Sequence, residues 1–267
     1  MNIVVCVKQV FDPEAPARSF GVDAAGQTIV VARGVSKMIG AYDESAVEAG
    51  LQIRDQHGGK VTLVSLGPPS AAQFLKETMA FGADEAILLA DEATDRGDSF
   101  SAGHALARAI GKIGAFDIIL CGREGSDTDA GIVGPCIAED LSLPCATLAR
   151  RVEVGSGGSL RVERAVEDGF QVVELTPPAV VTVTSECYQI RYPTMATIIA
   201  ADEKDVTVWS MADIRSQHEE NSASEPATTL VKLFVPVRET ACQLFEADTL
   251  DQAAADLVGT LRSKGLT

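Results

Sequence analysis

Short apolar runs that alternate with helical patterns constrain the fold of this chain more than any other feature. The segments expected to be strands are 3–7, 61–66, 86–90 and 117–121, and those expected to be helices are 43–56, 70–81, 99–113 and 131–141. In the segments 43–56 and 99–113, apolar residues recur every three or four positions, which places them on one face. Strands that alternate with helices are typical of a parallel sheet covered on both faces. The sequence therefore predicts an α/β fold with a parallel sheet.

The pattern changes in the second half of the chain. Four closely spaced segments, 146–154, 160–165, 170–175 and 179–184, are expected to be strands, and Gly155-Ser156-Gly157-Gly158 is typical of a hairpin turn. We expect them to add an antiparallel β portion. Residues 215–229 are polar and rich in Ser, which indicates a linker.

A short extended piece, 230–235, and a helix at about 249–263 follow this linker. So short an appendage cannot bury its own apolar face. The predicted organisation is an α/β nucleotide-binding domain over 1–214, a linker over 215–229, and a C-terminal arm over 230–267 that docks on its own domain or on a partner.

Composition and charge exclude several classes of function. A formal charge of −16 opposes binding to nucleic acid or to anionic membranes. No apolar run is long enough to span a bilayer, and the N-terminus has the pattern of a strand and not of a signal peptide. The cysteines occur singly and are expected to be buried free thiols of a reducing, cytoplasmic compartment. They are Cys6, Cys121, Cys136, Cys145, Cys187 and Cys242.

Residues 116–135 combine a strand, a loop of small residues and a helix. The loop of Gly, Ser, Asp and Thr leads into a helix whose N-terminus offers unpaired N–H groups. Glycine lets a backbone approach a phosphate closely, and a helix N-terminus attracts anions. This pattern predicts a nucleotide phosphate site, although neither GxxxxGK[ST] nor GxGxxG is present.

Groups that could carry out catalysis are sparse. His57, His104 and His218 are far apart in the sequence, so we expect no metal site. In the loop, Asp129 is expected to cap the following helix and Asp127 to stabilise the turn. The pattern is that of a binding site without catalytic residues.

Several motifs, in order along residues 1–210, resemble those of the electron-transfer flavoprotein β subunit family. They are Val4–Val10 (VVCVKQV), Ala41–Gly50 (AYDESAVEAG), Val64–Pro68 (VSLGP), Ala80–Asp84 (AFGAD), Gly122–Pro135, Pro178–Thr184 (PAVVTVT) and Arg191–Ile198 (RYPTMATI). The resemblance implies an adenine-nucleotide-binding α/β domain, similar to nucleotide α-hydrolases, that pairs with an α subunit carrying FAD near the interface.

The same resemblance implies a role in electron transfer. Electrons would pass between a flavin dehydrogenase, often an acyl-CoA dehydrogenase, and a further acceptor such as a quinone oxidoreductase. The chain would be a carrier subunit and not an enzyme by itself. Its own nucleotide would be AMP, or a second FAD in the branch that performs electron bifurcation with NADH; Val133-Gly134-Pro135 resembles that branch and favours FAD.

The resemblance also implies which residues form the nucleotide site. The adenine pocket would be lined by Cys6, Val7, Lys8, Ala41, Tyr42, Ser65 and Leu66. The phosphates would lie against Gly122, Arg123, Asp127, Thr128, Asp129, Ala130, Gly131, Ile132, Val133 and Gly134. The chain departs from the family pattern at Gly40-Ala41, at Glu124-Gly125-Ser126 and at Ile132, so the nucleotide is either held differently or lost.

A partner-binding loop is implied at Arg191, Tyr192, Thr194 and Met195, where Met195 takes the place of the family's apolar anchor for the dehydrogenase. The alternative hypothesis is an ATP-binding enzyme of the nucleotide α-hydrolase or adenylating type, which shares the fold and the phosphate loop.

Overall fold

A single sheet of nine strands organises the chain. The computed structural model describes residues 1–90, 97–185, 188–214, 226–236 and 242–266. The strand order is β11-β10-β9-β12-β8-β1-β6-β7-β13. The central strands are β1 (Asn2–Cys6), β6 (Lys60–Gly67), β7 (Glu85–Ala90), β8 (Ile118–Gly122) and β12 (Ala179–Val183), and β13 (Thr207–Ser210) lies at one edge. These six strands are parallel. The sequence predicts this for β1, β6, β7 and β8, but it assigns the segment of β12 to the antiparallel portion and does not predict β13.

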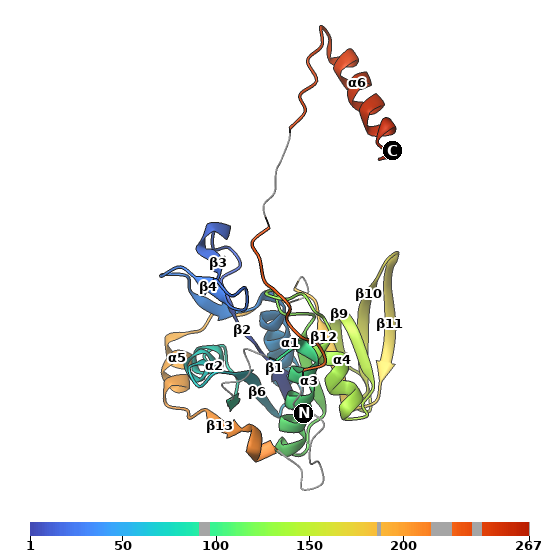
Figure 1. Cartoon of the computed structure of the whole chain (residues 1–267). Coiled ribbons are helices and arrows are strands. Elements are labelled where there is room, and N and C mark those ends of the chain that lie inside the picture. The colour runs from blue at the N-terminus through green and yellow to red at the C-terminus, as the bar shows by residue number, and fades with distance from the viewer. Residues whose placement is uncertain (91–96, 186–187, 215–225, 237–241, 267) are drawn as a thin grey trace. The chain divides into compact units, whose positions relative to one another are not determined.

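Helices cover both faces of the sheet (Figure 1). The helices α1 (Ala41–His57) and α2 (Ala71–Met79) pack on the face to which Val5 and Leu63 point. The helices α3 (Ser99–Ile113) and α4 (Val133–Asp140) pack on the other face, together with Val4 and Ile119. Neighbouring residues of a strand point to opposite faces, so strands buried on both faces are apolar at nearly every position.

The predicted antiparallel portion is present and continues the same sheet. The strands β9 (Cys145–Val154), β10 (Leu160–Val166) and β11 (Gly169–Leu175) form antiparallel pairs, and Gly155 and Ser159 close the first hairpin. Strand β12 instead runs parallel to both β8 and β9. The predicted α/β fold class is confirmed, with the antiparallel strands at one end of the sheet.

The smaller elements lie at the two ends of the described chain. Early in the chain, β2 (Gln9–Phe11) pairs with β5 (Lys37–Ile39), and β3 (Phe20–Val22) pairs with β4 (Ile29–Val31). Among the described residues, Ala17–Ser19 forms a 3-10 turn, and another, Met211–Ile214, follows β13. Helix α5 (Met195–Asp202) precedes β13, and α6 (Leu250–Ser263) is the last element.

The described residues fall into two compact units. One comprises 1–20 and 30–231, and the other comprises 21–29 and 232–267. Within the second unit, the Leu233 N–H donates to the Gly26 carbonyl at 2.7 Å. The predicted terminal helix is confirmed as α6, none of whose residues is buried. Most of the predicted linker, and Cys187 and His218, lie outside the described residues.

The expectation that the cysteines are buried holds only in part. Cys6 and Cys121 are buried on adjacent strands, Cys136 is half-buried, and Cys145 and Cys242 are exposed. Cys145 is the first residue of β9, where the chain enters the sheet, and Cys242 belongs to the C-terminal segment. Within the described residues, no helix is both long and apolar enough to cross a membrane.

Candidate functional site

The strand order creates a switch point beside the central strand. From β1 the chain proceeds to β6 and β7 on one side, then returns to β8 on the other side of β1. Connections leave β1 and β8 toward opposite faces, and in open α/β sheets such a divergence leaves a crevice beyond the carboxyl ends of the two strands. Open α/β sheets bind ligands at such a crevice.

The residues predicted to bind nucleotide come together at this edge. Cys6 is the last residue of β1, and Gly122 is the last residue of β8. Ser65 and Leu66 lie near the end of β6, and Lys8 lies two residues after the end of β1. Ala41 and Tyr42 open α1, and the loop 123–132 leads into Val133 and Gly134 of α4. Cys6 and Cys121 are register partners, so the carboxyl ends of β1 and β8 are level with each other.

Asp43 lies at the centre of this edge, and sequence reasoning missed it as a site residue. Only 8% of the residue is exposed. Its Oδ2 accepts the Lys8 N–H at 2.7 Å, and the Gly122 N–H also donates to the carboxyl. Burial raises the pKa of Asp43 to about 7, although these two N–H groups act in the opposite direction. The carboxyl therefore joins the start of α1 to the ends of β1 and β8.

Gly122 is required for this close approach. A Cβ at this position would lie 2.3 Å from Oδ1 of Asp43 and 2.8 Å from Cβ of Tyr42. Such distances are far below van der Waals contact, so any side chain would displace α1 from the end of β8.

Both cationic side chains of the predicted phosphate site have carboxylate partners. The Lys8 ammonium lies 2.7 Å from Oδ2 of Asp127, and Nε of Arg123 lies 3.3 Å from Oε1 of Glu124. The Arg123 guanidinium also lies 6.0 Å from the ring centroid of Tyr42. Both ion pairs are partly exposed, and such pairs contribute roughly 0–1 kcal/mol. A phosphate that binds Lys8 and Arg123 therefore has to displace carboxylate contacts that contribute little free energy.

The loop before α4 forms a turn that is closed by its own backbone hydrogen bonds. The Thr128 and Asp129 N–H groups donate to the Gly125 carbonyl, and Asp129 and Gly131 have positive φ angles of 47° and 65°. The prediction that Asp129 caps the helix is wrong, because this turn delays the start of α4 to Val133 and places Ile132 at the N-cap.

No side chain caps α4, so the first N–H groups of the helix are not satisfied by a cap. A Cβ on Gly134 would lie 2.4 Å from Cγ2 of Thr182, so glycine lets this helix start close to β12. Amide donors and two cations suit phosphates, and the carboxylates of Asp127 and Glu124 could accept ribose hydroxyls. This set of donors and acceptors fits the phosphates and ribose of a nucleotide.

The predicted partner-binding residues differ in their surroundings. Tyr192 and Met195 are 88% and 71% exposed. The Thr194 side chain accepts the Thr197 N–H and caps α5, while Arg191 is bound to Glu48 of α1. Of these four residues in the described structure, Tyr192 and Met195 are therefore the two whose side chains face solvent without a hydrogen-bond or ion-pair partner.

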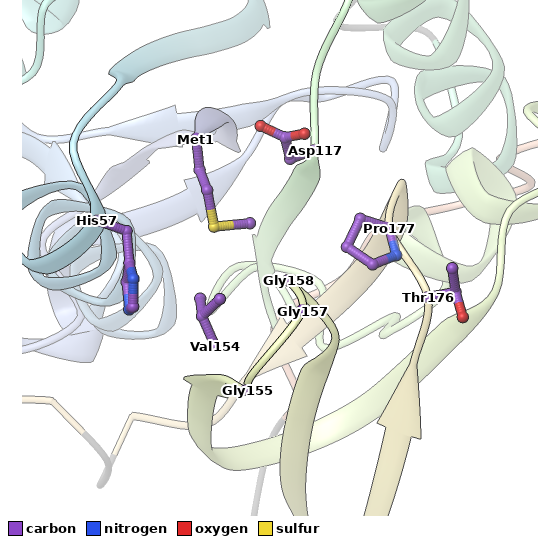
Figure 2. Close-up of a pocket in the computed structure, with 9 residues that line it drawn as sticks. All are labelled: Met1, His57, Asp117, Val154, Gly155, Gly157, Gly158, Thr176 and Pro177. Carbon is purple, nitrogen blue, oxygen red and sulfur yellow. The ribbon is translucent and has the colours of Figure 1, made fainter.

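A separate cavity lies at the opposite edge of the sheet. It has a volume of about 540 Å³. Figure 2 shows Met1, His57, Asp117 and the glycines of the β9–β10 turn around it. Met1 precedes β1 and Asp117 precedes β8, so the cavity is not part of the crevice at the carboxyl ends.

The fold and the crevice define a class of protein, namely a doubly wound α/β module with a site suited to a nucleotide. Comparison with known proteins narrows this class, because the sequence model of the electron transfer flavoprotein domain matches residues 27–214.

Over 265 residues, or 99% of each chain, the protein is 37% identical to electron transfer flavoprotein subunit beta of Thermoanaerobacterium thermosaccharolyticum. It is 40% identical over 214 residues, 80% of each chain, to the same subunit of Clostridium acetobutylicum. It is 32% identical over 265 residues, 99% of each chain, to subunit CarD of the caffeyl-CoA reductase-Etf complex of Acetobacterium woodii. The chain belongs to the electron transfer flavoprotein β subunit family.

Proposed function

We propose that this chain pairs with an electron transfer flavoprotein α subunit and carries electrons between a flavin dehydrogenase and a further acceptor, such as a quinone-linked oxidoreductase. The observation that carries the proposal is a similarity to β subunits that extends over nearly the whole chain. FAD would lie at the interface with the α subunit. The chain would act as a carrier in a cytoplasmic complex.

The crevice at the carboxyl ends of β1 and β8 would hold this subunit's own nucleotide. The α4 amides, Lys8 and Arg123 would bind its phosphates, and Asp43 would keep α1 and the two strand ends together around it. Val133-Gly134-Pro135 at the start of α4 favours a second FAD over AMP. A second FAD would be compatible with bifurcation of electrons from NADH.

The dehydrogenase would dock on the exposed apolar residues Tyr192, Met195 and Ile199. One relative belongs to a caffeyl-CoA reductase-Etf complex, which supports a partner of the acyl-CoA dehydrogenase type. The arm over 230–267 would dock on the α subunit, since α6 buries none of its own residues.

Ligand analysis of the co-expressed heterodimer tests the proposal. Denaturation would release the ligands, and mass spectrometry would quantify them. Two FAD per heterodimer would support the bifurcating form, and one FAD with one AMP would support a one-flavin carrier. Failure to associate with any α subunit would contradict the proposal, and turnover of ATP by the chain alone would favour the adenylating alternative.

A further inference from the structure

One polar stripe of α1 holds the chain segment that precedes α5. The Ser45 hydroxyl donates to the carbonyls of Ser185 and Tyr188, at 3.1 and 3.3 Å. Further along the same helix, Glu48 and Asp55 both contact Arg191. Positions 45, 48 and 55 lie on one side of a helix because their spacings are close to whole turns.

Arg191 makes most of the bonds between this stripe and the segment. Its Nε and a terminal nitrogen donate to the two oxygens of Glu48, at 2.9 and 3.0 Å. The other terminal nitrogen donates to Asp55 at 2.8 Å, and the Arg191 backbone N–H donates to Glu48 at 3.1 Å. A two-pronged guanidinium–carboxylate contact fixes orientation as well as distance.

Glu48 is buried, which makes this contact different from a surface ion pair. Only 4% of the residue is exposed. Burial tends to raise the pKa of Glu48, but hydrogen bonds from Arg191 and Gln52 outweigh this effect and hold the pKa below its ordinary value. A buried carboxylate that loses its partner is strongly unfavourable, so the structure has a large preference for keeping Arg191 in place.

The residues next to Arg191 are the exposed residues of the docking surface. Tyr192 follows it directly, and Thr194 begins α5 through a reciprocal capping contact with Thr197. Met195 is the first residue of α5. Because Arg191 is fixed on α1, the backbone that presents Tyr192 and Met195 has a defined position before any partner arrives.

We propose that Arg191 is a positioning residue, which through Glu48 and Asp55 fixes the segment that presents Tyr192 and Met195 to the dehydrogenase. This inference rests on the proposed function of the docking surface. It replaces the expectation that Arg191 itself contacts the partner. A preformed surface loses less conformational entropy when the partner binds.

Hydrogen exchange of the heterodimer tests the positioning itself. In Arg191→Gln and Glu48→Gln, the amides of residues 188–202 should exchange at least tenfold faster than in the wild type, while β1 and β6 should be unchanged. Arg191→Lys should be intermediate, because an ammonium cannot form the two-pronged contact. Arg161→Gln is the matched control, since it removes a guanidinium that pairs with Glu153 in the β9–β10 hairpin. Unchanged exchange at 188–202 in both Arg191→Gln and Glu48→Gln would overturn the inference.

Electron-transfer kinetics test its consequence. The probe is butyryl-CoA dehydrogenase with butyryl-CoA, and dithionite is the comparison reductant because it requires no protein docking. Arg191→Gln and Glu48→Gln should each raise the KM for the dehydrogenase about tenfold, with kcat and reduction by dithionite unchanged. If Arg191 contacts the partner directly, Glu48→Gln should retain the wild-type KM, which would overturn the inference.

The hydrogen-exchange and kinetic experiments together distinguish failure of the inference from failure of the proposed function. If the dehydrogenase does not reduce the wild-type heterodimer, the proposed partner is wrong, yet hydrogen exchange still decides whether Arg191 positions the segment. The FAD content and circular dichroism of each variant show whether it has a folding defect. If Arg191→Gln misfolds, Arg191→Lys, which keeps the charge, takes its place in both experiments.

Discussion

Asp43 shows how one side chain can determine the shape of a ligand crevice. The carboxyl accepts the Lys8 N–H at 2.7 Å and a further bond from the Gly122 N–H. These contacts connect α1 to the ends of two strands that are more than a hundred residues apart in sequence. The charges of Lys8 and Asp127 act on the Asp43 carboxyl, so its own charge also affects the potential at the crevice.

Replacing Asp43 with Asn should remove a pH dependence of stability. The pKa of Asp43 rises from an ordinary value of 3.8 to about 7 in the folded chain. Below pH 3.8 both states are protonated. Between pH 3.8 and 7 only the folded state retains the proton, so its stability falls as the pH rises, by at most about 1.4 kcal/mol per pH unit. Above pH 7 this contribution is constant.

Urea unfolding of wild type and Asp43→Asn between pH 4 and 8 checks this expectation. As the pH rises toward 7, the unfolding free energy of the wild type should fall relative to that of Asp43→Asn. Above pH 7 the difference between the two should stay constant. Glu139→Gln, which removes an exposed carboxylate on α4, is the control. A difference that is independent of pH would show that Asp43 keeps an ordinary pKa.

Gly122→Ala should disturb the same contact sterically. The added Cβ would lie 2.3 Å from Oδ1 of Asp43, so α1 or β8 has to move. We expect a loss of roughly 1–3 kcal/mol in unfolding free energy, which is typical of overpacking, and weaker nucleotide retention. Calorimetry and the nucleotide content of the purified heterodimer measure the two effects. A fully stable variant with normal nucleotide content would contradict the expectation.

The sequence predicts which residues gather at the crevice, but not the state of their side chains. The family resemblance names Cys6, Ser65 and Gly122 as site residues, and the strand pattern agrees with this because the carboxyl ends of parallel strands meet at one edge. The pairing of Lys8 with Asp127 depends on two loops, far apart in sequence, that meet only in the fold. Burial of Asp43 likewise depends on tertiary neighbours, and its only local signal was a carboxylate in the first turn of a mostly buried helix.

At the scale of elements, the sequence predicts helices well where their ends carry local signals. Helix α3 has its predicted bounds, because Asp98 and Ser101 cap each other's backbone at its start and Gly114 follows its end. Helix α4 begins two residues later than predicted, because Gly131 adopts a positive φ. The parallel direction of β12 had no local signal, since it depends on pairing with β8 and β9.

The packing of α3 on α4 supports a prediction with a control on the same helix. A Cβ on Gly103 would lie 2.6 Å from Cβ of Cys136, whereas one on Gly111 would make an ordinary 3.9 Å contact with Leu141. Gly103→Ala should therefore lower the unfolding free energy by about 1–3 kcal/mol. Gly111→Ala should be neutral or should stabilise by up to about 1 kcal/mol through helix propensity. Thermal unfolding of both variants checks the contrast, and equal effects would contradict it.

At the scale of the whole molecule, the sequence predicts the parallel sheet but not the order of its strands. The order depends on which face each crossover helix covers, and apolar periodicity does not carry that information when both faces are buried. The switch point between β1 and β8, and with it the crevice, therefore became visible only in the structure. The C-terminal segment is different, because its exposed apolar face is evident in both the sequence and the structure.

The last prediction concerns α6, whose Leu250 is 90% exposed and whose Leu257 and Val258 are also exposed. Exposed leucines on one face of a helix are typical of a partner surface. Removal of residues 250–267 should leave the melting temperature of the rest of the chain nearly unchanged, because α6 buries none of its own residues. It should, however, weaken association with the α subunit, as measured by calorimetric titration. Leu257→Lys should have the same effect, whereas Gln252→Lys, which adds the same charge outside the leucine face, should not. If both lysine variants bind equally well, then the leucine face of α6 does not contact the α subunit.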